Sequence, residues 1–164
     1  MSNSNFTVPD ICDAFLGKVA IGDIFLNSYG GIEKFFGEIR AVDCAHSNSV
    51  VKEIVQENGD GKVLVINHSG DKLCSMVGDQ IAQKAYENNW RGIFVNGYIR
   101  DIEIIKNISI GVCAKNAYPM KTDKTVGVGT RDKNFKIGSV EIRSGNWIYV
   151  DANGWAVSKN KLIF

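Results

Sequence analysis

Three charged residues in the middle of the chain are spaced so that they could share one chemical site. Asp79 is followed, after twenty residues, by the adjacent pair Arg100 and Asp101. An aspartate offers hard oxygen atoms that suit Mg²⁺ or Mn²⁺, and an arginine offers a planar fork that suits a carboxylate or an enolate. Together these side chains resemble an electrophilic site, at which a substrate oxygen could develop negative charge.

The segments around these residues predict a strand, a helix and a second strand. Residues 62–67 and 92–96 are apolar runs of strand length, as expected for strands that are covered on both faces. Between them, the apolar residues that follow Asp79 are spaced as on one face of an amphipathic helix. This order predicts a right-handed βαβ unit with parallel strands.

Parallel strands place the loops that follow them at the same edge of a sheet. Ligands of open α/β sheets bind there, because loops and helix N-termini converge beyond the carboxyl ends of the strands. We therefore expect the loop of residues 67–79 to face the loop of residues 97–101. At the helix start, which opens with Gly78, the backbone amides near Gln80 and Ile81 lack helical partners and could bind a substrate carboxylate.

Simpler roles for the same residues are also open. Asp79 stands where the N-cap residue of the predicted helix is expected, and such a residue accepts a hydrogen bond from a backbone amide. Arg100 and Asp101 could form a solvated ion pair on a loop, which would contribute little to stability. The pattern alone thus allows either a helix cap with a surface pair or a shared site.

The whole chain predicts one α/β domain over residues 1–164, of which residues 1–7 form a loose tail. We expect a helical layer on a mainly parallel sheet, with a strand-rich C-terminal third that forms a second β layer or a partly closed barrel. The further helices are predicted at 10–16 and at 50–55 (capped by 47–49), and the further strands at 36–44, 108–114, 135–142, 147–150 and 154–157.

Composition and charge exclude several classes of protein. The 164 residues include 19 basic and 18 acidic side chains, so no overall field attracts nucleic acid or an anionic membrane. The four cysteines and two histidines are too scattered for a zinc site, and the cysteines are expected to be reduced thiols of a cytoplasmic protein. Residues 1–10 have neither the basic start nor the apolar core of a signal peptide or a membrane anchor.

The central segment resembles the signature of the RraA-like family, which contains the regulators of ribonuclease activity A and the 4-hydroxy-4-methyl-2-oxoglutarate aldolases. Its metal-dependent lyases are marked by an Asp, twenty residues and then Arg-Asp, as found here. The resemblance implies a swivelling β/β/α fold and a ring-shaped homotrimer, or a hexamer of two rings, with sites near subunit boundaries. The similar residues are 10–13, 29–31, 36–39, 61–65, 76–82, 88–93, 96–101 and 145–154, nearly the whole chain.

The resemblance also implies catalytic roles. Asp101, directly or through water, would hold a divalent metal, Mg²⁺ or Mn²⁺, and Asp79 would hold a water molecule of that metal. Arg100 would stabilise the enolate oxygen of a 2-oxo acid substrate. Carbon–carbon cleavage would then release pyruvate as its enolate, either from 4-hydroxy-4-methyl-2-oxoglutarate or, by decarboxylation, from oxaloacetate.

For the substrate, the resemblance implies contacts with the helix start at 78–81 and with the basic residues Lys121 and Lys124, which lie where family members carry a basic residue. One departure concerns residues 67–71. They are Asn-His-Ser-Gly-Asp, where the family usually has Asp-Gly-Gly-Gly-Ser. We therefore expect a more polar and less permissive backbone beside the site, and a different substrate preference.

The second hypothesis is a non-catalytic regulator with the same fold, which would bind ribonuclease E or an RNA helicase and inhibit RNA degradation. The regulators of the family tend to be acidic and to lack the Asp after the Arg, whereas this chain is nearly neutral and has Asp101. Both points favour a lyase. A methyltransferase finds no support, because no glycine-rich loop suited to S-adenosylmethionine follows the strand at 62–67.

Overall fold

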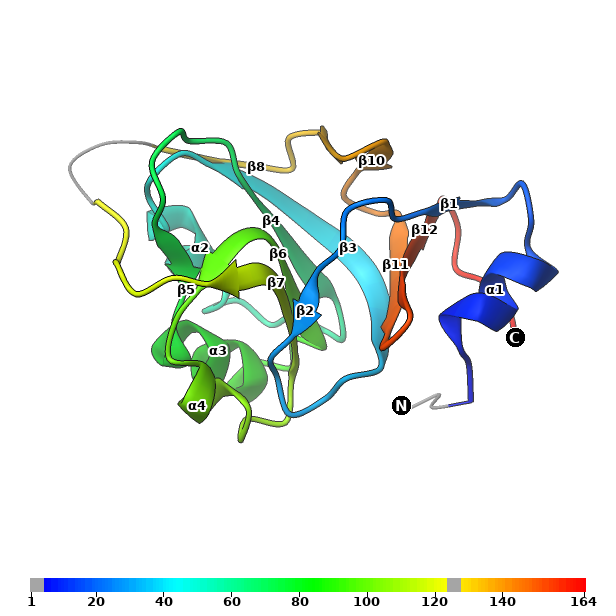
Figure 1. The fold of residues 1–164 in the computed structure, drawn as a ribbon, viewed down its shortest axis with the longest axis horizontal. Coiled ribbons are helices and arrows are strands. Elements are labelled where there is room, and N and C mark those ends of the chain that lie inside the picture. Colours follow the sequence, from blue (N-terminus) through cyan, green and yellow to red (C-terminus); the bar gives the residue numbers. More distant parts are fainter. Residues whose placement is uncertain (1–4, 124–127) are drawn as a thin grey trace.

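A computed structural model describes residues 5–123 and 128–164, which form a mixed α/β fold with a large sheet and few helices (Figure 1). The helices are α1 (Val8–Ala14), α2 (Ser49–Ile54), α3 (Asp79–Glu87) and α4 (Ile102–Ile105). The strands are β1 (Val19–Ile21), β2 (Asn27–Ser28), β3 (Phe35–Cys44), β4 (Val63–His68), β5 (Ser75–Val77), β6 (Gly92–Ile99), β7 (Gly111–Ala117), β8 (Gly129–Arg131), β9 (Phe135–Ile137), β10 (Val140–Ile142), β11 (Trp147–Asp151) and β12 (Gly154–Ser158).

The centre of the sheet consists of the parallel strands β3, β4, β6 and β7, in that order. β4 and β6, the strands predicted at 62–67 and 92–96, are direct neighbours, and the short strand β5 comes between β4 and the helix at Asp79 in the chain. The flanking strands are antiparallel: β11 pairs with β3 on one side, and β2 pairs with β7 on the other. The sheet as a whole is therefore mixed: its central pairings are parallel, and the pairings of the C-terminal strands, which short turns connect, are antiparallel.

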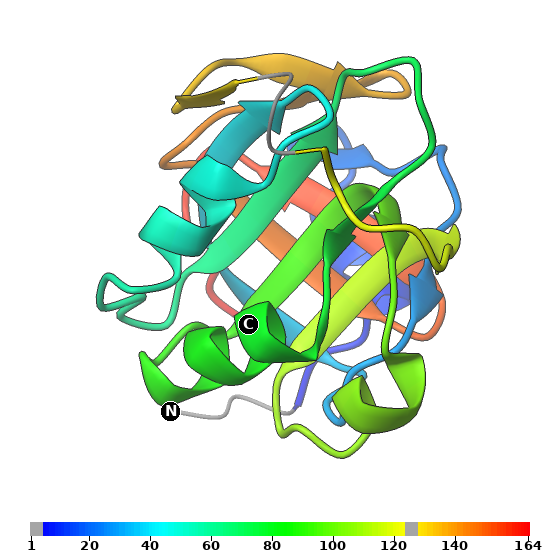
Figure 2. The ribbon, with the colours of Figure 1, turned by 90° about the vertical axis from the view of Figure 1, so that its left-hand side faces the viewer.

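Two apolar cores cover the two faces of the parallel strands, which is why β4 is a continuous apolar run. Leu64 and Ile66 of β4 pack in the core beneath α2, α3 and α4. Val63 and Val65 pack in a second core, which includes residues of β9 to β12. Figure 2 shows the three helices in front of the sheet and the C-terminal strands behind it.

Of the loose tail predicted at residues 1–7, residues 1–4 lie outside the described residues, whereas Phe6 and Thr7 are held against the fold. Phe6 is buried, and the Thr7 hydroxyl accepts a hydrogen bond from the Asp10 amide and caps α1. The Phe6 ring lies 5.6 Å from the ring of Phe36 and 5.3 Å from that of Phe164. These partners are distant in sequence, so the polar surroundings of Phe6 gave no sign of its burial.

Replacing Phe6 with leucine should therefore lower the free energy of unfolding by about 1–2 kcal/mol, because the ring contacts are lost while an apolar side chain is kept. Urea denaturation of the wild type and the variant measures this difference. The same substitution at Phe25, whose side chain is 90% exposed, is the control and should leave the midpoint almost unchanged. Equal midpoints for Phe6→Leu and the wild type would show that the segment is not anchored.

Several predicted elements have different bounds in the structure. The strand expected at 108–114 is β7, which begins at Gly111 and continues to Ala117. The single strand expected at 135–142 is a hairpin of β9 and β10, which turns at Gly138 with a φ of +60°. The loop expected at 97–101 is shorter, because β6 continues to Ile99 between β5 and β7. Backbone pairing with distant strands sets these bounds.

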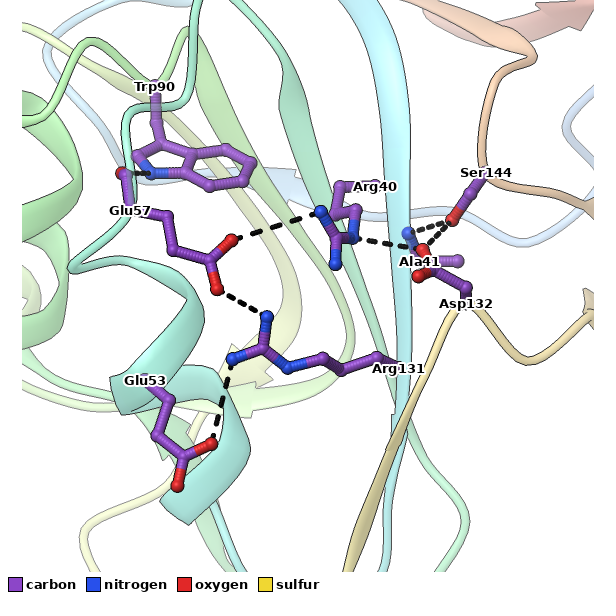
Figure 3. Close-up of polar contacts among 8 residues, drawn as sticks. All are labelled: Arg40, Ala41, Glu53, Glu57, Trp90, Arg131, Asp132 and Ser144. Carbon is purple, nitrogen blue, oxygen red and sulfur yellow. Dashed lines mark hydrogen bonds and ion pairs between the residues drawn. The ribbon is translucent and has the colours of Figure 1, made fainter.

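An ionic network connects the end of α2 with β3 and β8 (Figure 3). Arg131 of β8 pairs with Glu57 and, at 3.6 Å, with Glu53. Arg40 of β3 lies 3.9 Å from Glu57 and 2.9 Å from Asp132. Since these charges form a connected network, we expect them to stabilise the docking of β8 more than isolated surface pairs would.

Arg131→Met should lower the free energy of unfolding by about 1 kcal/mol at low salt, and by less at high salt, because the charges are partly exposed and are screened. Thermal unfolding at two salt concentrations measures the effect. Arg143→Met, which breaks only the local pair with Glu141, is the matched control and should change stability by less. A loss that does not depend on salt would contradict an electrostatic origin.

Within the described ranges, no helix is long and apolar enough to cross a membrane.

Candidate functional site

The charged residues singled out in the sequence line one cavity of about 220 Å³. It lies where β5, the start of α3 and the end of β6 meet the segment around Lys121. The lining residues are Asn48, Lys52, Ser75, Gly78, Asp79, Gln80, Ile81, Arg100, Asp101, Lys121 and Thr122. The structure thus brings together the expected candidates Gly78, Asp79, Gln80, Ile81, Arg100, Asp101 and Lys121, whereas Lys124 lies outside the described residues.

Asp101 links the two segments that were expected to face each other. Its Oδ2 atom accepts a hydrogen bond of 3.2 Å from the backbone amide of Asp79. The Asp101 backbone adopts the left-handed conformation (φ 61°, ψ 36°), which is uncommon for residues other than glycine and is frequently found at functional sites. This conformation turns the chain from β6 into α4 and leaves the carboxylate beside the start of α3.

The close approach of Asp101 explains the glycine at position 78. A Cβ atom on Gly78 would lie 2.7 Å from Asp101 Oδ2, inside van der Waals contact. Gly78 is also the N-cap residue of α3, and Asp79 is the first residue of the helix. The interpretation of Asp79 as the N-cap is therefore wrong, and its side chain does not cap the helix.

The start of α3 offers backbone donors to the cavity. The Gly78 carbonyl accepts a hydrogen bond from the Ala82 amide, and the Asp101 carboxylate accepts one from the Asp79 amide. Among the residues that the structure describes, the amides of Gln80 and Ile81 have no hydrogen-bond acceptor. Such amides, together with the positive end of the helix dipole, bind anionic oxygen atoms such as those of a carboxylate.

The cations of the cavity come from three separate segments: Lys52 from α2, Arg100 from the end of β6, and Lys121. Arg100 does not pair with Asp101, so the two do not form the solvated ion pair that was one alternative. Instead, Nη1 of Arg100 donates a hydrogen bond of 3.4 Å to the carbonyl of Pro119. Three cations and two carboxylates around one small cavity suit an anionic substrate bound with a metal.

The oxygen atoms of Asp79 and Asp101 are available to a cation. Within the described chain, the Asp79 carboxylate has no hydrogen-bond or ion-pair partner, and Asp101 uses only Oδ2. Mg²⁺ is commonly bound by one or two carboxylates and keeps several waters, so this donor set fits Mg²⁺ or Mn²⁺. Those same ranges hold no group of three or more His, Cys, Asp or Glu side chains that could hold a metal ion.

Four further lining residues were not predicted as site residues from the sequence pattern. Asn48 belongs to the segment that was expected only to cap α2, and Lys52 lies on the helix that follows. Ser75 and Thr122 are buried, and Ser75 forms a parallel bridge with Lys121. A polar residue between apolar neighbours, such as Ser75 before Met76 and Val77, is the one local signal that could have marked them.

The loop at 67–71, where the sequence departs from the family pattern, does not line the cavity. Asn67 instead takes part in a row of polar side chains across the parallel strands. Its amide donates to Asp43 Oδ1 at 2.7 Å, and its Oδ1 accepts from Asn96 at 2.8 Å. Any effect of this loop on substrate preference must therefore act through neighbouring residues rather than by contact.

The pair of Cys74 and His68, with Sγ and Nε2 3.7 Å apart, does not form a competing catalytic site. Burial raises the pKa of the Cys74 thiol, and burial also lowers the pKa of His68. Both shifts favour the neutral forms, whereas a nucleophilic dyad requires a thiolate beside an imidazolium. Burial likewise raises the pKa values of Cys44 and Cys113 to about 12.

A larger cavity of about 610 Å³ lies at the opposite end of the parallel strands, around Phe36, Trp90 and Trp147. Its single carboxylate is that of Asp60. Because it lacks paired carboxylates and an unpaired helix start, it offers less chemistry than the smaller cavity at Asp79 and Asp101.

The sequence profile of the RraA-like family, described as Aldolase/RraA, matches residues 8–157. This chain belongs to the RraA-like family. Among the relatives of this RraA-like protein, one from Marinomonas sp. (strain MWYL1) is 42% identical over 155 residues, which are 94% of this chain and 96% of the relative. That relative carries the provisional name 4-hydroxy-4-methyl-2-oxoglutarate aldolase.

Two solved structures have the same RraA-like fold. One is a protein from Geobacillus kaustophilus HTA426 that is described as an S-adenosylmethionine:2-dimethylmenaquinone methyltransferase. It superposes with a TM-score of 0.90 at 34% sequence identity, and the superposition covers 96% of this chain and 97% of the Geobacillus chain. The other is the RNA-processing inhibitor RraA from Thermus thermophilis, which superposes with a TM-score of 0.90 at 26% sequence identity. This superposition covers 97% of this chain and 96% of the Thermus chain.

Proposed function

We propose that this protein is a lyase that cleaves a 2-oxo acid through the enolate of pyruvate, with Mg²⁺ or Mn²⁺ as cofactor. The observation that carries the proposal is the single cavity at which Asp79, Arg100 and Asp101 meet the unpaired amides of Gln80 and Ile81. The name of the Marinomonas relative supports 4-hydroxy-4-methyl-2-oxoglutarate as the substrate. Oxaloacetate is the second substrate that the same chemistry would accept.

The roles of the residues follow from their chemistry. Asp101 and Asp79 would hold the cation, which supplies Lewis-acid stabilisation of negative charge on the substrate. The amides of Gln80 and Ile81 bind the carboxylate next to the keto group. Lys121, which also lines the cavity, attracts the second carboxylate of the substrate.

In the aldolase reaction, the proton leaves the C4 hydroxyl and the C3–C4 bond breaks. C4 becomes the keto carbon of one pyruvate, and the bonding electrons pass to the other fragment as an enolate. Arg100 stabilises this developing charge, because its guanidinium donates to oxygen more strongly as the oxygen becomes anionic. Asp79 accepts the hydroxyl proton through a water molecule, and protonation of the enolate carbon then gives the second pyruvate. Decarboxylation of oxaloacetate passes through the same enolate.

Pyruvate release measures this function directly. The purified protein is treated with EDTA, dialysed, and assayed with each substrate without metal and after addition of Mg²⁺ or Mn²⁺. We expect activity only with added metal, and its loss on renewed chelation. If neither substrate releases pyruvate above the uncatalysed rate with either metal, the proposed lyase function is wrong.

A regulatory role is the second candidate, favoured by the similarity to the RNA-processing inhibitor from Thermus thermophilis. Its test is a pull-down of ribonuclease E and of an RNA helicase with the purified protein, with Asp101→Asn as a parallel sample. Binding by both forms, without lyase activity in the wild type, would favour a regulator over an enzyme.

We further infer a swivelling β/β/α arrangement, a homotrimer or a hexamer of two rings, and a cytoplasmic location, as the family resemblance implies. Light scattering coupled to size-exclusion chromatography tests the assembly. A monomer at micromolar concentration would contradict a ring.

A further inference from the structure

Asn48 is placed to cap a helix but does not use its side chain for this purpose. It is the N-cap residue of α2, a position where the side chain of an asparagine normally accepts a hydrogen bond from a helix amide. Here its side chain makes no such bond. The side chain is buried instead, at 8% exposed, and lines the cavity of Asp79 and Asp101. A residue that departs from its local role at a site commonly serves the site.

Both polar atoms of the Asn48 amide are engaged. Nδ2 donates a hydrogen bond of 3.0 Å to the carbonyl of Met76, and Oδ1 accepts one of 3.0 Å from the hydroxyl of Thr122. Thr122 is itself 6% exposed. These bonds join segments that are 28 and 74 residues away from Asn48 in the chain.

The two segments carry different parts of the site and lie side by side, since Ser75 forms a parallel bridge with Lys121. Met76 lies two residues before Gly78 and three before Asp79, whereas Thr122 directly follows Lys121. Asn48 therefore ties the strand that leads into α3 to the segment that carries Lys121. Under the proposed function, one carboxylate of the substrate binds the amides at the start of α3, and Lys121 attracts the other.

We infer that Asn48 is a positioning residue for substrate binding: through Met76 and Thr122 it holds the start of α3 and Lys121 at the spacing that a dicarboxylic 2-oxo acid requires. The catalytic part of this inference rests on the proposed function. Asn48 acts through these partners and is not assigned a step in the reaction.

Backbone hydrogen bonds also hold the Lys121 segment, since Ser75 N donates to Met120 O and Asp123 N donates to His46 O. These bonds lie on either side of Lys121 and Thr122. Asn48 adds the only side-chain bond that the structure shows for Thr122 among the described residues. Loss of the Thr122 hydroxyl would leave the buried Oδ1 atom of Asn48 without a hydrogen-bond partner. A shift of the Lys121 segment can relieve the resulting free-energy cost.

The test compares Thr122→Val, which removes the hydroxyl at nearly constant volume, with Thr122→Ser, which keeps it. The first readout is hydrogen–deuterium exchange of peptides that cover residues 76–81 and 118–123, which needs neither substrate nor metal. We expect faster exchange in Thr122→Val, and exchange close to that of the wild type in Thr122→Ser.

The second readout is kinetic. If spacing sets the affinity for the substrate, Thr122→Val should raise the KM about tenfold while kcat changes by less than about threefold. Thr122→Ser should stay within about twofold of the wild type in both parameters. Asn48→Ala removes this bond and also the one to Met76, so its effect should be at least as large as that of Thr122→Val. Adding Thr122→Val to Asn48→Ala should change the KM little further, because the bond that Thr122→Val removes is already absent.

Tyr149→Phe controls for a general loss of buried hydrogen bonds. The Tyr149 hydroxyl accepts bonds from Leu162 N and Ser158 Oγ outside the cavity lining, so its loss should lower the melting temperature without changing the KM. A Tyr149→Phe variant with the same KM increase as Thr122→Val would reduce Asn48 to a general structural role.

Unchanged exchange and unchanged KM in Thr122→Val would overturn the inference. If the wild type releases no pyruvate, the proposed function fails, and the exchange data alone decide whether Asn48 holds the two segments together.

Discussion

Asp101→Asn should lower the rate of pyruvate release by about 10³-fold at saturating substrate and metal. Asparagine has the same shape and can still accept the hydrogen bond from the Asp79 amide, so the turn into α4 should persist. What is lost is the negative charge, and with it an oxygen donor that binds Mg²⁺ or Mn²⁺ strongly. A loss of this size corresponds to about 4 kcal/mol of transition-state stabilisation, which lies within the range that a metal ion supplies.

Kinetic assays over a range of Mn²⁺ concentrations, together with calorimetric titration of Mn²⁺, check this prediction. Glu103→Gln is the matched control. Glu103 also lies on α4 but is exposed and does not line the cavity, so its amide form should keep both activity and metal affinity. Near wild-type turnover by Asp101→Asn would remove Asp101 from the mechanism, whatever its effect on metal binding.

Gly78→Ala should lower kcat/KM by about 10²-fold while costing little stability. The Gly78 backbone has φ −119° and ψ −170°, which alanine adopts without strain. However, the new methyl group would lie 2.7 Å from Asp101 Oδ2. The carboxylate, at the end of a rotatable side chain, can move away more easily than the backbone can. The displacement therefore disturbs the catalytic geometry and lowers kcat/KM, but it changes the free energy of unfolding little.

A double-mutant cycle separates this mechanism from a general disturbance of α3. In the Asp101→Asn background, Gly78→Ala should have an effect of less than about threefold, because the group that it displaces no longer functions. Urea denaturation of the single variant should show a change of less than about 1 kcal/mol. If the effects of Gly78→Ala and Asp101→Asn multiply in the double variant, the methyl group acts through something other than Asp101.

Much of the site could be predicted because its parts are local in the sequence. The helix at Asp79 follows from the spacing of Ile81, Ala82, Ala85 and Tyr86. The first three pack in the core as expected, whereas Tyr86 is exposed. The apolar runs of β4 and β6 likewise predict neighbouring strands. Because both strands end at the same edge, the residues that follow them meet there. Position along adjacent parallel strands is thus enough to place Asp79 near Arg100 and Asp101.

Other features depend on contacts between distant segments. The sequence around Gly97 resembles a loop, yet β6 continues to Ile99 because β5 and β7 pair with it on both sides. Phe6 is anchored by rings that lie far along the chain. A single sequence shows none of these pairings, since a local pattern can show that a residue is buried or extended but not which distant segment it meets.

The sequence by itself determined the mixed α/β character, the helix that presents its amides, and the acidic and basic residues that could act on a 2-oxo acid. Only the tertiary structure decided that Asp79 is not the N-cap, that Asp101 accepts the Asp79 amide from a left-handed backbone, and that Gly78 leaves room for it. It also brought in Asn48 and Thr122 from remote segments. The physical reason is that residue type and local spacing fix what a side chain can do, whereas packing fixes which side chains it meets.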